Sequence, residues 1–251
     1  MRLYLDIGNT AMKWRAYPEA GGPAAVRLEG GRAHQRDWVR LAEELAAQCA
    51  ERVTQLEVAS VAGRESDILL GEALDKALGC RPRFYYSPAS DYGVTNAYAE
   101  PARLGVDRWL AVVEAWHRDG AAIIIDCGSA LTVDAVDAAG AHLGGYIVPG
   151  LGMLRESLFR GTAQVRVTEA VNTGVGLGRS TSEGVEHGVL RMSVAFVADV
   201  VVELRKTLND TCSVYLTGGD ARVLQPLLPF QVPCDPDLVL DGLERVTAGN
   251  L

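Results

Sequence analysis

Cysteine, aromatic residues and long apolar runs are scarce in this sequence of 251 residues, and each shortage excludes a class of protein. The five cysteines lie far apart without a CxxC pair, which argues against a disulfide framework or a zinc site and favours reduced thiols. No apolar run approaches the roughly 20 residues of a membrane helix, and the first strand reaches Asp6 too early for a signal peptide. We therefore expect a cytoplasmic protein with no membrane partner.

Positive charge is also scarce, because 24 Lys and Arg residues stand against 32 Asp and Glu residues, a formal net charge of −8. No basic run offsets this charge, so nucleic acid is not expected as a partner. The four histidines show no metal-ligand spacing, and neither GxSxG nor GxxxxGK[ST] is present, so a serine hydrolase or a P-loop enzyme is not indicated. An anionic ligand must then be held by backbone amides, metal ions and a few placed cations.

Strand and helix patterns alternate along the chain and restart half-way, which predicts an α/β fold. In the first half the pattern predicts a loop over 85–98, strands over 3–6, 11–16, 24–28 and 56–61, and helices over 36–50, 65–78 and 101–117, the last begun by Pro101. In the second half it predicts strands over 122–126, 131–136, 142–148 and 214–216, and helices over 151–159, 181–208, 221–227 and 237–246. A hinge near Asp119–Gly120 divides the chain into two domains, 1–119 and 120–251.

Two turns repeat the same pattern. Asp6-Ile7-Gly8-Asn9 and Asp126-Cys127-Gly128-Ser129 each follow an apolar strand and precede another. This internal similarity predicts two related lobes.

The first turn, from Asp6 to Thr10, suits phosphate binding. We expect Gly8 to take a positive φ, so that Asn9, Thr10 and nearby N–H groups face a phosphate. Asp6, at the carboxyl end of its strand, can hold Mg²⁺ directly or through water, and Lys13 can neutralise the phosphate. The same residues also occur in ordinary hairpins capped by an Asx side chain.

The second turn offers Ser129 and Thr132 as donors or cation ligands. Asp126 lies at the edge of a buried strand, where a carboxylate needs a partner, and a bound cation would supply one. Two glycine-rich loops, Gly144–Gly150 and Leu216–Asp220, leave strands for helices. The helix N-terminus after the first can attract an anion, and the flat backbone of the second can pass under a base, although each loop alone is also typical of an ordinary turn.

The pair Asp107-Arg108 interrupts an otherwise helical, apolar pattern. Asp107 can accept a proton from a substrate hydroxyl while Arg108 grips a substrate oxygen, with the hydroxyl of Tyr98 in the same pocket. A charge pair on a helix surface is the alternative interpretation of the same two residues.

These motifs together resemble type III pantothenate kinase. The resemblance rests on DIGNTxxKW at 6–14, YxxxxRLGVDRW at 98–109, DCGSALTVD at 126–134 and HLGGYIVPG at 142–150, and it extends through TGGDA at 217–221 to the tail at 237–243. It implies the acetate and sugar kinase/Hsp70/actin fold, which is ribonuclease H-like, with ATP between two lobes. It also implies phosphorylation of pantothenate, the first step of coenzyme A biosynthesis, by a homodimer that uses Mg²⁺ with ATP and a monovalent cation, K⁺ or NH₄⁺.

The resemblance assigns roles residue by residue. Asp107 matches the proton acceptor and Asp126 the monovalent-cation ligand. The ATP contacts that it implies are Asp6, Ile7, Gly8, Asn9, Thr10, Ala11, Met12, Lys13 and Ser129. The pantothenate contacts that it implies are Tyr98, Gly105, Val106, Asp107, Arg108 and Thr181.

The chain departs from the family at three of these positions. Ser129 replaces the usual Thr and keeps the hydroxyl, Ser180-Thr181 replaces the usual Asn-Thr, and Gly184 replaces the usual Ala.

Two other functions remain open on the sequence alone. One is a nucleotide-binding regulator or ATPase of the same fold, and the other is a kinase of a different small hydroxy acid.

Overall fold

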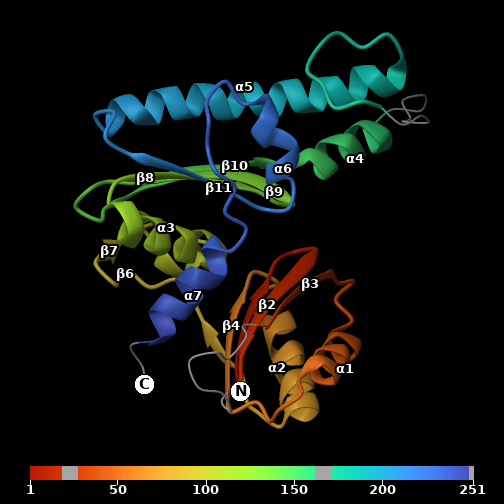
Figure 1. Cartoon of the computed structure of the whole chain (residues 1–251), viewed down its shortest axis with the longest axis vertical. Helices are drawn as coiled ribbons and strands as arrows, with labels where there is room; N and C mark the ends of the chain where they lie inside the picture. Colours follow the sequence, from red (N-terminus) through yellow and green to blue (C-terminus); the bar gives the residue numbers. More distant parts are fainter. Residues whose placement is uncertain (19–27, 162–170, 249–251) are drawn as a thin grey trace. The chain divides into compact units, whose positions relative to one another are not determined.

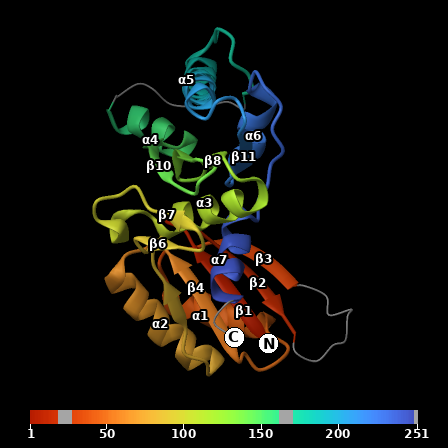
Figure 2. The ribbon, with the colours of Figure 1, turned by 90° about the vertical axis from the view of Figure 1, so that its left-hand side faces the viewer.

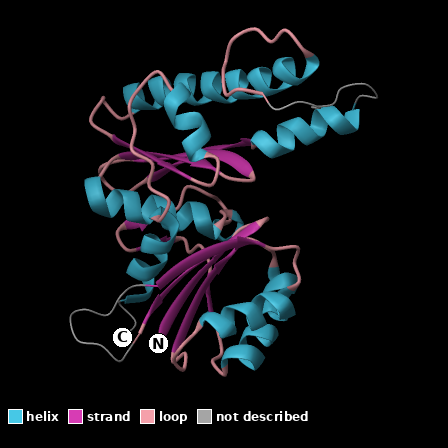
Figure 3. Ribbon diagram, turned by 45° about the vertical axis from the view of Figure 1, so that its right-hand side comes forward, coloured by secondary structure: helices cyan, strands magenta, loops and turns pink. Residues whose placement is uncertain are grey.

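A computed structural model describes residues 1–18, 28–161 and 171–248, and these form two compact units. The first unit contains Met1–Tyr92, Tyr98–Glu114 and the segment from Leu238 onward, and the second contains Gly93–Ala97 and Ala115–Asp237. The last helix therefore packs with the N-terminal sheet, whereas the sequence analysis assigned 120–251 to one domain. Each unit holds one sheet with helices against it (Figure 3).

The first unit is built on a five-stranded sheet in the order β3-β2-β1-β4-β5. β1, β2 and β3 form an antiparallel meander, and β4 and β5 continue parallel to β1. The strands are β1 Arg2–Ile7, β2 Ala11–Tyr17, β3 Leu28–Ala33, β4 Gln55–Ser60 and β5 Arg83–Tyr85. The helices are α1 Trp38–Gln48, α2 Arg64–Leu78, the short 3-10 helix η1 Pro101–Arg103, α3 Val106–Asp119, which continues into the second unit, and α7 Leu238–Ala248.

Side-chain alternation along β1 decides which helices cover which face of this sheet. Leu3, Leu5 and Ile7 join a buried core with residues of α1 and α2. The intervening Tyr4 lies on the α7 side of the sheet, near Glu244 and Thr247. The sheet is thus covered by α1 and α2 on one side and by α7 on the other (Figures 1 and 2).

The second unit repeats the strand order of the first. Its four-stranded sheet has the order β10-β9-β8-β11. As in the first unit, three consecutive strands, β8, β9 and β10, form an antiparallel meander. The later strand β11 pairs in parallel with β8, the first strand of that meander. Its strands are β8 Ala122–Cys127, β9 Ala130–Val136, β10 His142–Pro149 and β11 Ser213–Thr217. Its helices are α4 Leu151–Gly161, α5 Thr181–Thr207, α6 Ala221–Leu224 and the 3-10 helix η2 Gln225–Leu227. A separate two-stranded sheet pairs β6 Ser90–Asp91 with β7 Val94–Thr95.

The long helix α5 buries one valine-rich face on the second sheet, together with Ile123, Ile125, Leu131 and Val133 of β8 and β9. The predicted strands of this unit and its helices over 151–159 and 181–208 are confirmed, but the helix expected over 221–227 is two short elements, α6 and η2. The repeated strand order confirms the prediction of two related lobes.

Two predictions for the first half need correction. The helix expected over 101–117 is two elements, because the chain leaves the helical conformation at Leu104, whose ψ is 128°. The expected loop over 85–98 contains the β6–β7 hairpin, and β5 was not predicted. The strand expected over 24–28 lies almost entirely outside the described residues, and β3 begins at Leu28.

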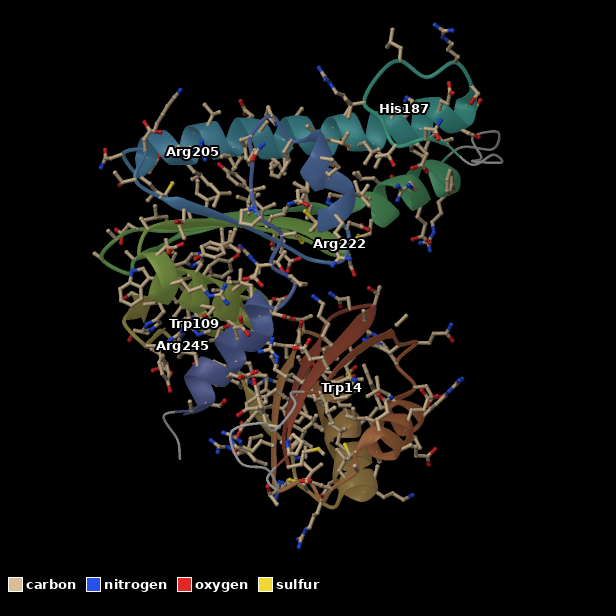
Figure 4. All side chains as sticks on the ribbon, viewed as in Figure 1. Trp14, Trp109, His187, Arg205, Arg222 and Arg245 are labelled. Carbon is tan, nitrogen blue, oxygen red and sulfur yellow. The ribbon has the colours of Figure 1, made fainter. Side chains whose placement is uncertain are left out.

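The C-terminal helix is held to the sheet by an ion-pair network around Arg15. This guanidinium is only 1% exposed and donates to Asp241 Oδ1 and Glu244 Oε1, both at 2.5 Å. Burial opposes its charge, but hydrogen bonds to Glu244 and Asp241 outweigh that cost and raise its pKa. A second ion pair joins Arg245 of α7 to Glu114 of α3 (Figure 4).

We expect Arg15→Met to lower the free energy of unfolding by about 2–3 kcal/mol, because it leaves two partly buried carboxylates without their cation. Urea denaturation measures this loss. Arg40→Met is the matched control, since Arg40 pairs with Glu44 on an exposed helix face and should cost less than about 0.5 kcal/mol. Equal losses for the two variants would contradict a supporting role for Arg15.

Candidate active site

The β1–β2 turn is closed by one short backbone hydrogen bond. The Gly8 N–H donates to the Ala11 carbonyl at 2.9 Å. A Cβ atom on Gly8 would lie 3.1 Å from that same oxygen, so glycine provides the space for this closure. The positive φ predicted for Gly8 is wrong, because Gly8 is not among the glycines in the left-handed region.

Within this turn the residues predicted to bind ATP differ in whether their side chains are exposed. The side chains of Ile7 and Met12 are each 1% exposed and belong to the core, so only their backbone can meet a ligand. Asn9, Thr10 and Ala11 are exposed at the tip. Asp6 and Lys13 lie opposite each other in the strand register and are half-buried.

The start of α3 fixes Asp107. Ser87 Oγ donates to the Leu104 carbonyl at 2.9 Å, and the Gly105 carbonyl accepts the Trp109 N–H of the first helical turn at 3.0 Å. Asp107 Oδ1 accepts the Arg108 N–H at 2.7 Å. A Cβ atom on Gly105 would lie 2.6 Å from Asp107 Oδ1, so a larger residue there would displace this carboxylate.

Arg108 is held inside the unit rather than on a helix surface. It is 6% exposed, and its Nη1 donates to the Tyr98 hydroxyl at 2.9 Å. Its guanidinium carbon also lies 5.8 Å from the centroid of the Tyr98 ring. The interpretation of Asp107-Arg108 as a surface charge pair is therefore wrong for Arg108. Val106 is 4% exposed, so its side chain packs in the core.

Val61 links the first turn to the start of α3, and the sequence analysis missed it. Its N–H donates to the Ile7 carbonyl at 3.0 Å, and its Cγ1 lies 3.8 Å from where a Gly105 Cβ would stand. Val61 follows β4, the parallel neighbour of β1. Because the carboxyl ends of neighbouring parallel strands share one edge of a sheet, the residue after β4 was a recognisable candidate.

Asp126, in the second unit, lies in a cradle of glycines at the end of β8. It is half-buried and stands beside Thr132 of β9 and Thr217 of β11 in the strand register. A Cβ atom on Gly218 would lie 2.4 Å from Asp126 Oδ1, and one on Gly128 would lie 3.4 Å from it. Burial, and then the nearby Asp126 charge, raise the pKa of the Cys127 thiol, so this thiol stays protonated.

Ser129 shares this turn. The Gly128 N–H donates to the Ala130 carbonyl at 3.0 Å, and the Gly150 N–H donates to the Ser129 carbonyl at 3.1 Å. Gly150 precedes α4, so the turn packs against the N-terminal end of a helix. This arrangement suits an anion near Ser129.

Thr181 begins α5 and lines a groove. Ser180 caps the helix by accepting the Glu183 N–H at 3.2 Å, which confirms the predicted helix start. The groove lies between α4 and α5, encloses about 470 Å³ and is mainly apolar, with Leu154, Leu158, Gly184, Val185 and Met192 among its lining residues. Thr181 therefore adds a hydroxyl to an apolar surface.

The family model for type III pantothenate kinase matches residues 2–203 of this chain. The chain belongs to the type III pantothenate kinase family. A relative named type III pantothenate kinase from Alcanivorax borkumensis is 53% identical over 248 residues, which cover 99% of each chain.

Solved structures show the fold. The ethanolamine utilization protein EutJ from Carboxydothermus hydrogenoformans gives a TM-score of 0.53 at 14% identity over 98% of this chain and 89% of its own. A Sinorhizobium meliloti protein provisionally identified as a 2-dehydro-3-deoxygalactonokinase gives 0.55 at 14% identity over 100% and 99%. The predicted acetate and sugar kinase/Hsp70/actin fold is confirmed.

Each unit assembles a different part of the residues that the family resemblance indicated. The first unit brings together the Asp6–Lys13 turn and, through Val61, the Gly105–Arg108 segment with Tyr98. The second unit carries Asp126 and Ser129 on one turn and Thr181 at the start of α5.

Within the described ranges no helix is both long and apolar enough to cross a membrane.

Gly218 offers a sharp test of the Asp126 cradle. Its φ is +95°, and a Cβ atom there would also lie 2.5 Å from the Cys127 carbonyl. Gly218→Ala should lower the free energy of unfolding by about 2–4 kcal/mol, through strain and displacement of the turn. Gly219→Ala, with no atom within 4 Å of its Cβ, should change it by less than about 1 kcal/mol. Chemical denaturation compares the two, and a neutral Gly218→Ala would contradict the close packing.

Proposed function

We propose that this chain transfers the γ-phosphoryl group of ATP to the hydroxyl of pantothenate, and that Asp107 accepts the proton of that hydroxyl. The family match makes the chain a pantothenate kinase of coenzyme A biosynthesis. The observation that carries the finer proposal is the start of α3, where Asp107 and a buried Arg108 bonded to Tyr98 share a compact unit with the β1–β2 turn.

Asp107 suits the role of proton acceptor. One carboxylate oxygen is fixed by the Arg108 N–H in the first turn of a helix, where the helix dipole favours a negative charge. Such a group orients a hydroxyl and takes its proton late, as the bond to phosphorus forms. Arg108 and Tyr98 are proposed to form hydrogen bonds with pantothenate oxygens. Gly105, Val106 and Thr181 are proposed as further pantothenate contacts.

The phosphates of ATP are proposed to lie against the Asp6–Lys13 turn and Ser129. Among the described residues, no three His, Cys, Asp or Glu side chains form a group that could hold a metal ion. Mg²⁺ would arrive with ATP and be held mainly by phosphate oxygens and water, with the half-buried Asp6 of β1 as its protein contact. When bound, Mg²⁺ neutralises charge on the phosphates.

Asp126 is proposed to hold K⁺ or NH₄⁺. The donor set fits a weakly hydrated cation, because a half-buried carboxylate stands beside the hydroxyl-bearing Thr132 and Thr217 in the strand register. The bound cation would supply positive charge next to the phosphates. Asp126, through the cation, and Ser129, directly, would then both contact the phosphates of the same ATP molecule.

A coupled assay of ADP release tests this proposal. ADP release should depend on pantothenate and stay near background with other small hydroxy acids. Release of ADP without any acceptor would support the alternative of an ATPase, and a preference for another hydroxy acid would support a different kinase.

We propose a cytoplasmic homodimer of two-lobed chains, in which α7 belongs to the first lobe instead of the second. The second unit supports a dimer, because apolar side chains remain exposed on α4 and α5, with Met153 at 51% and Met192 at 52%. On α5, Val189 and Val200 are buried in the core against the sheet, while Met192 and Ala195 are exposed. Apolar residues on two sides of one helix are typical of a helix that packs against other structure on both sides.

Sedimentation velocity at micromolar concentration should show a dimer. Met192→Glu should shift the protein to monomer, since a charge would be buried in the proposed interface. Ile68→Glu is the control, because Ile68 is 63% exposed on α2 of the first unit and should leave the dimer intact. A monomeric wild type would contradict this proposal.

A further inference from the structure

His34 contacts the β1–β2 turn at two points, although the sequence analysis assigned it no role. Its backbone N–H donates to the Thr10 carbonyl at 3.0 Å, one step beyond the register in which Ala33 of β3 faces Ala11 of β2. Its ring Nε2 lies 3.0 Å from the Gly8 carbonyl oxygen. One residue thus binds the carbonyls on both sides of Asn9.

The ring of His34 is itself held in place. Nδ1 accepts the Arg36 N–H at 3.4 Å, and the ring centroid lies 5.0 Å from that of Trp38, which is buried at the start of α1. Arg36 has a φ of 60°, a left-handed conformation that non-glycine residues rarely adopt. Because Nδ1 is an acceptor, these partners assign the ring proton to Nε2, which then donates to the Gly8 carbonyl.

We propose that His34 is a positioning residue for phosphate binding, an inference that rests on the proposed role of the β1–β2 turn in holding ATP. In a trans peptide the C=O and the following N–H point in opposite directions, and no described peptide bond is cis. Holding the Gly8 carbonyl toward His34 therefore turns the Asn9 N–H away from it. His34 presents that N–H as a preorganised donor to a phosphate oxygen.

Kinetics of His34→Leu and His34→Gln test this role. Leu removes the ring donor, so the KM for ATP should rise about five- to tenfold, the scale of one lost hydrogen bond, while the KM for pantothenate changes less than about twofold. Gln can place an amide N–H near the position of Nε2, so His34→Gln should bring the KM for ATP back to within about threefold of the wild type.

A stability control separates positioning from general support. Leu45→Ala removes a buried side chain of α1 in the same core, so it should lower the urea midpoint without changing the KM for ATP. If His34→Leu and Leu45→Ala change the KM for ATP equally, or if Gln fails to restore it, the proposal is overturned.

Asp6→Asn separates this inference from the function on which it rests. If Asp6→Asn leaves ATP kinetics unchanged, the turn is not the phosphate site and the proposed function fails. If Asp6→Asn weakens ATP binding while His34→Leu does not, only the role of His34 is wrong.

Discussion

Replacing Asp107 by Asn should lower turnover by about 10²- to 10⁴-fold, the usual scale for loss of a general base. Asn keeps the shape of the side chain and can still accept the Arg108 N–H, but it cannot take a proton from a substrate hydroxyl. Because Asp6 and Ser129 are unchanged, ATP binding should survive. Steady-state kinetics with pantothenate, together with a direct binding measurement for ATP, checks both parts.

Glu65→Gln is the matched control for this variant. Glu65 also lies in the first turn of a helix, α2, but it belongs to no proposed contact and is exposed. Its loss should leave turnover within about twofold. Near-wild-type turnover for Asp107→Asn would make Asp107 an ordinary helix-capping carboxylate, and the acceptor site proposed here would be wrong.

Removing the Asp126 carboxylate should lower activity about 10- to 100-fold, the equivalent of one lost interaction with a charged group. Asp126→Ala should respond little to added K⁺, whereas the wild type should need K⁺ or NH₄⁺ for full activity. The reason is that this half-buried carboxylate, at the end of β8, stands beside the hydroxyl-bearing Thr132 and Thr217 in the strand register, where a cation would balance its charge. Activity titrated with KCl at constant ionic strength measures this dependence.

Sodium provides the contrasting condition. Full wild-type activity in Na⁺ alone would contradict a site selective for weakly hydrated cations. Asp199→Ala, which removes an exposed carboxylate of α5, should retain the K⁺ dependence of the wild type. If it lost that dependence as Asp126→Ala should, the effect would reflect net charge rather than a site.

The repeated Asp-x-Gly turns and most helices could be predicted because each depends on local pattern. The strand before Asp6 and the strand before Asp126 are short apolar runs bounded by glycine. Ser180 is a helix cap that local sequence reveals. Periodicity of apolar residues gave α1, α2 and α5 within a few residues.

The missed features depend on contacts between residues far apart in the sequence. The apolar pattern continues through Leu104 and Gly105, so the break before α3 is visible only where Ser87 binds the Leu104 carbonyl. His34 lies 26 residues from Gly8, and nothing in its neighbours indicates that contact. Gly8 needed no positive φ, because the approach of the Ala11 carbonyl, rather than backbone handedness, requires glycine there.

The final position of the γ-phosphoryl group tests the central claim most directly. The purified chain should be incubated with γ-labelled ATP, Mg²⁺, K⁺ and pantothenate, and the labelled products separated. We predict that the label appears in phosphopantothenate in a one-to-one ratio with ADP, and that Asp107→Asn slows this transfer while still binding ATP. Label released as inorganic phosphate, with pantothenate left unmodified, would contradict the account.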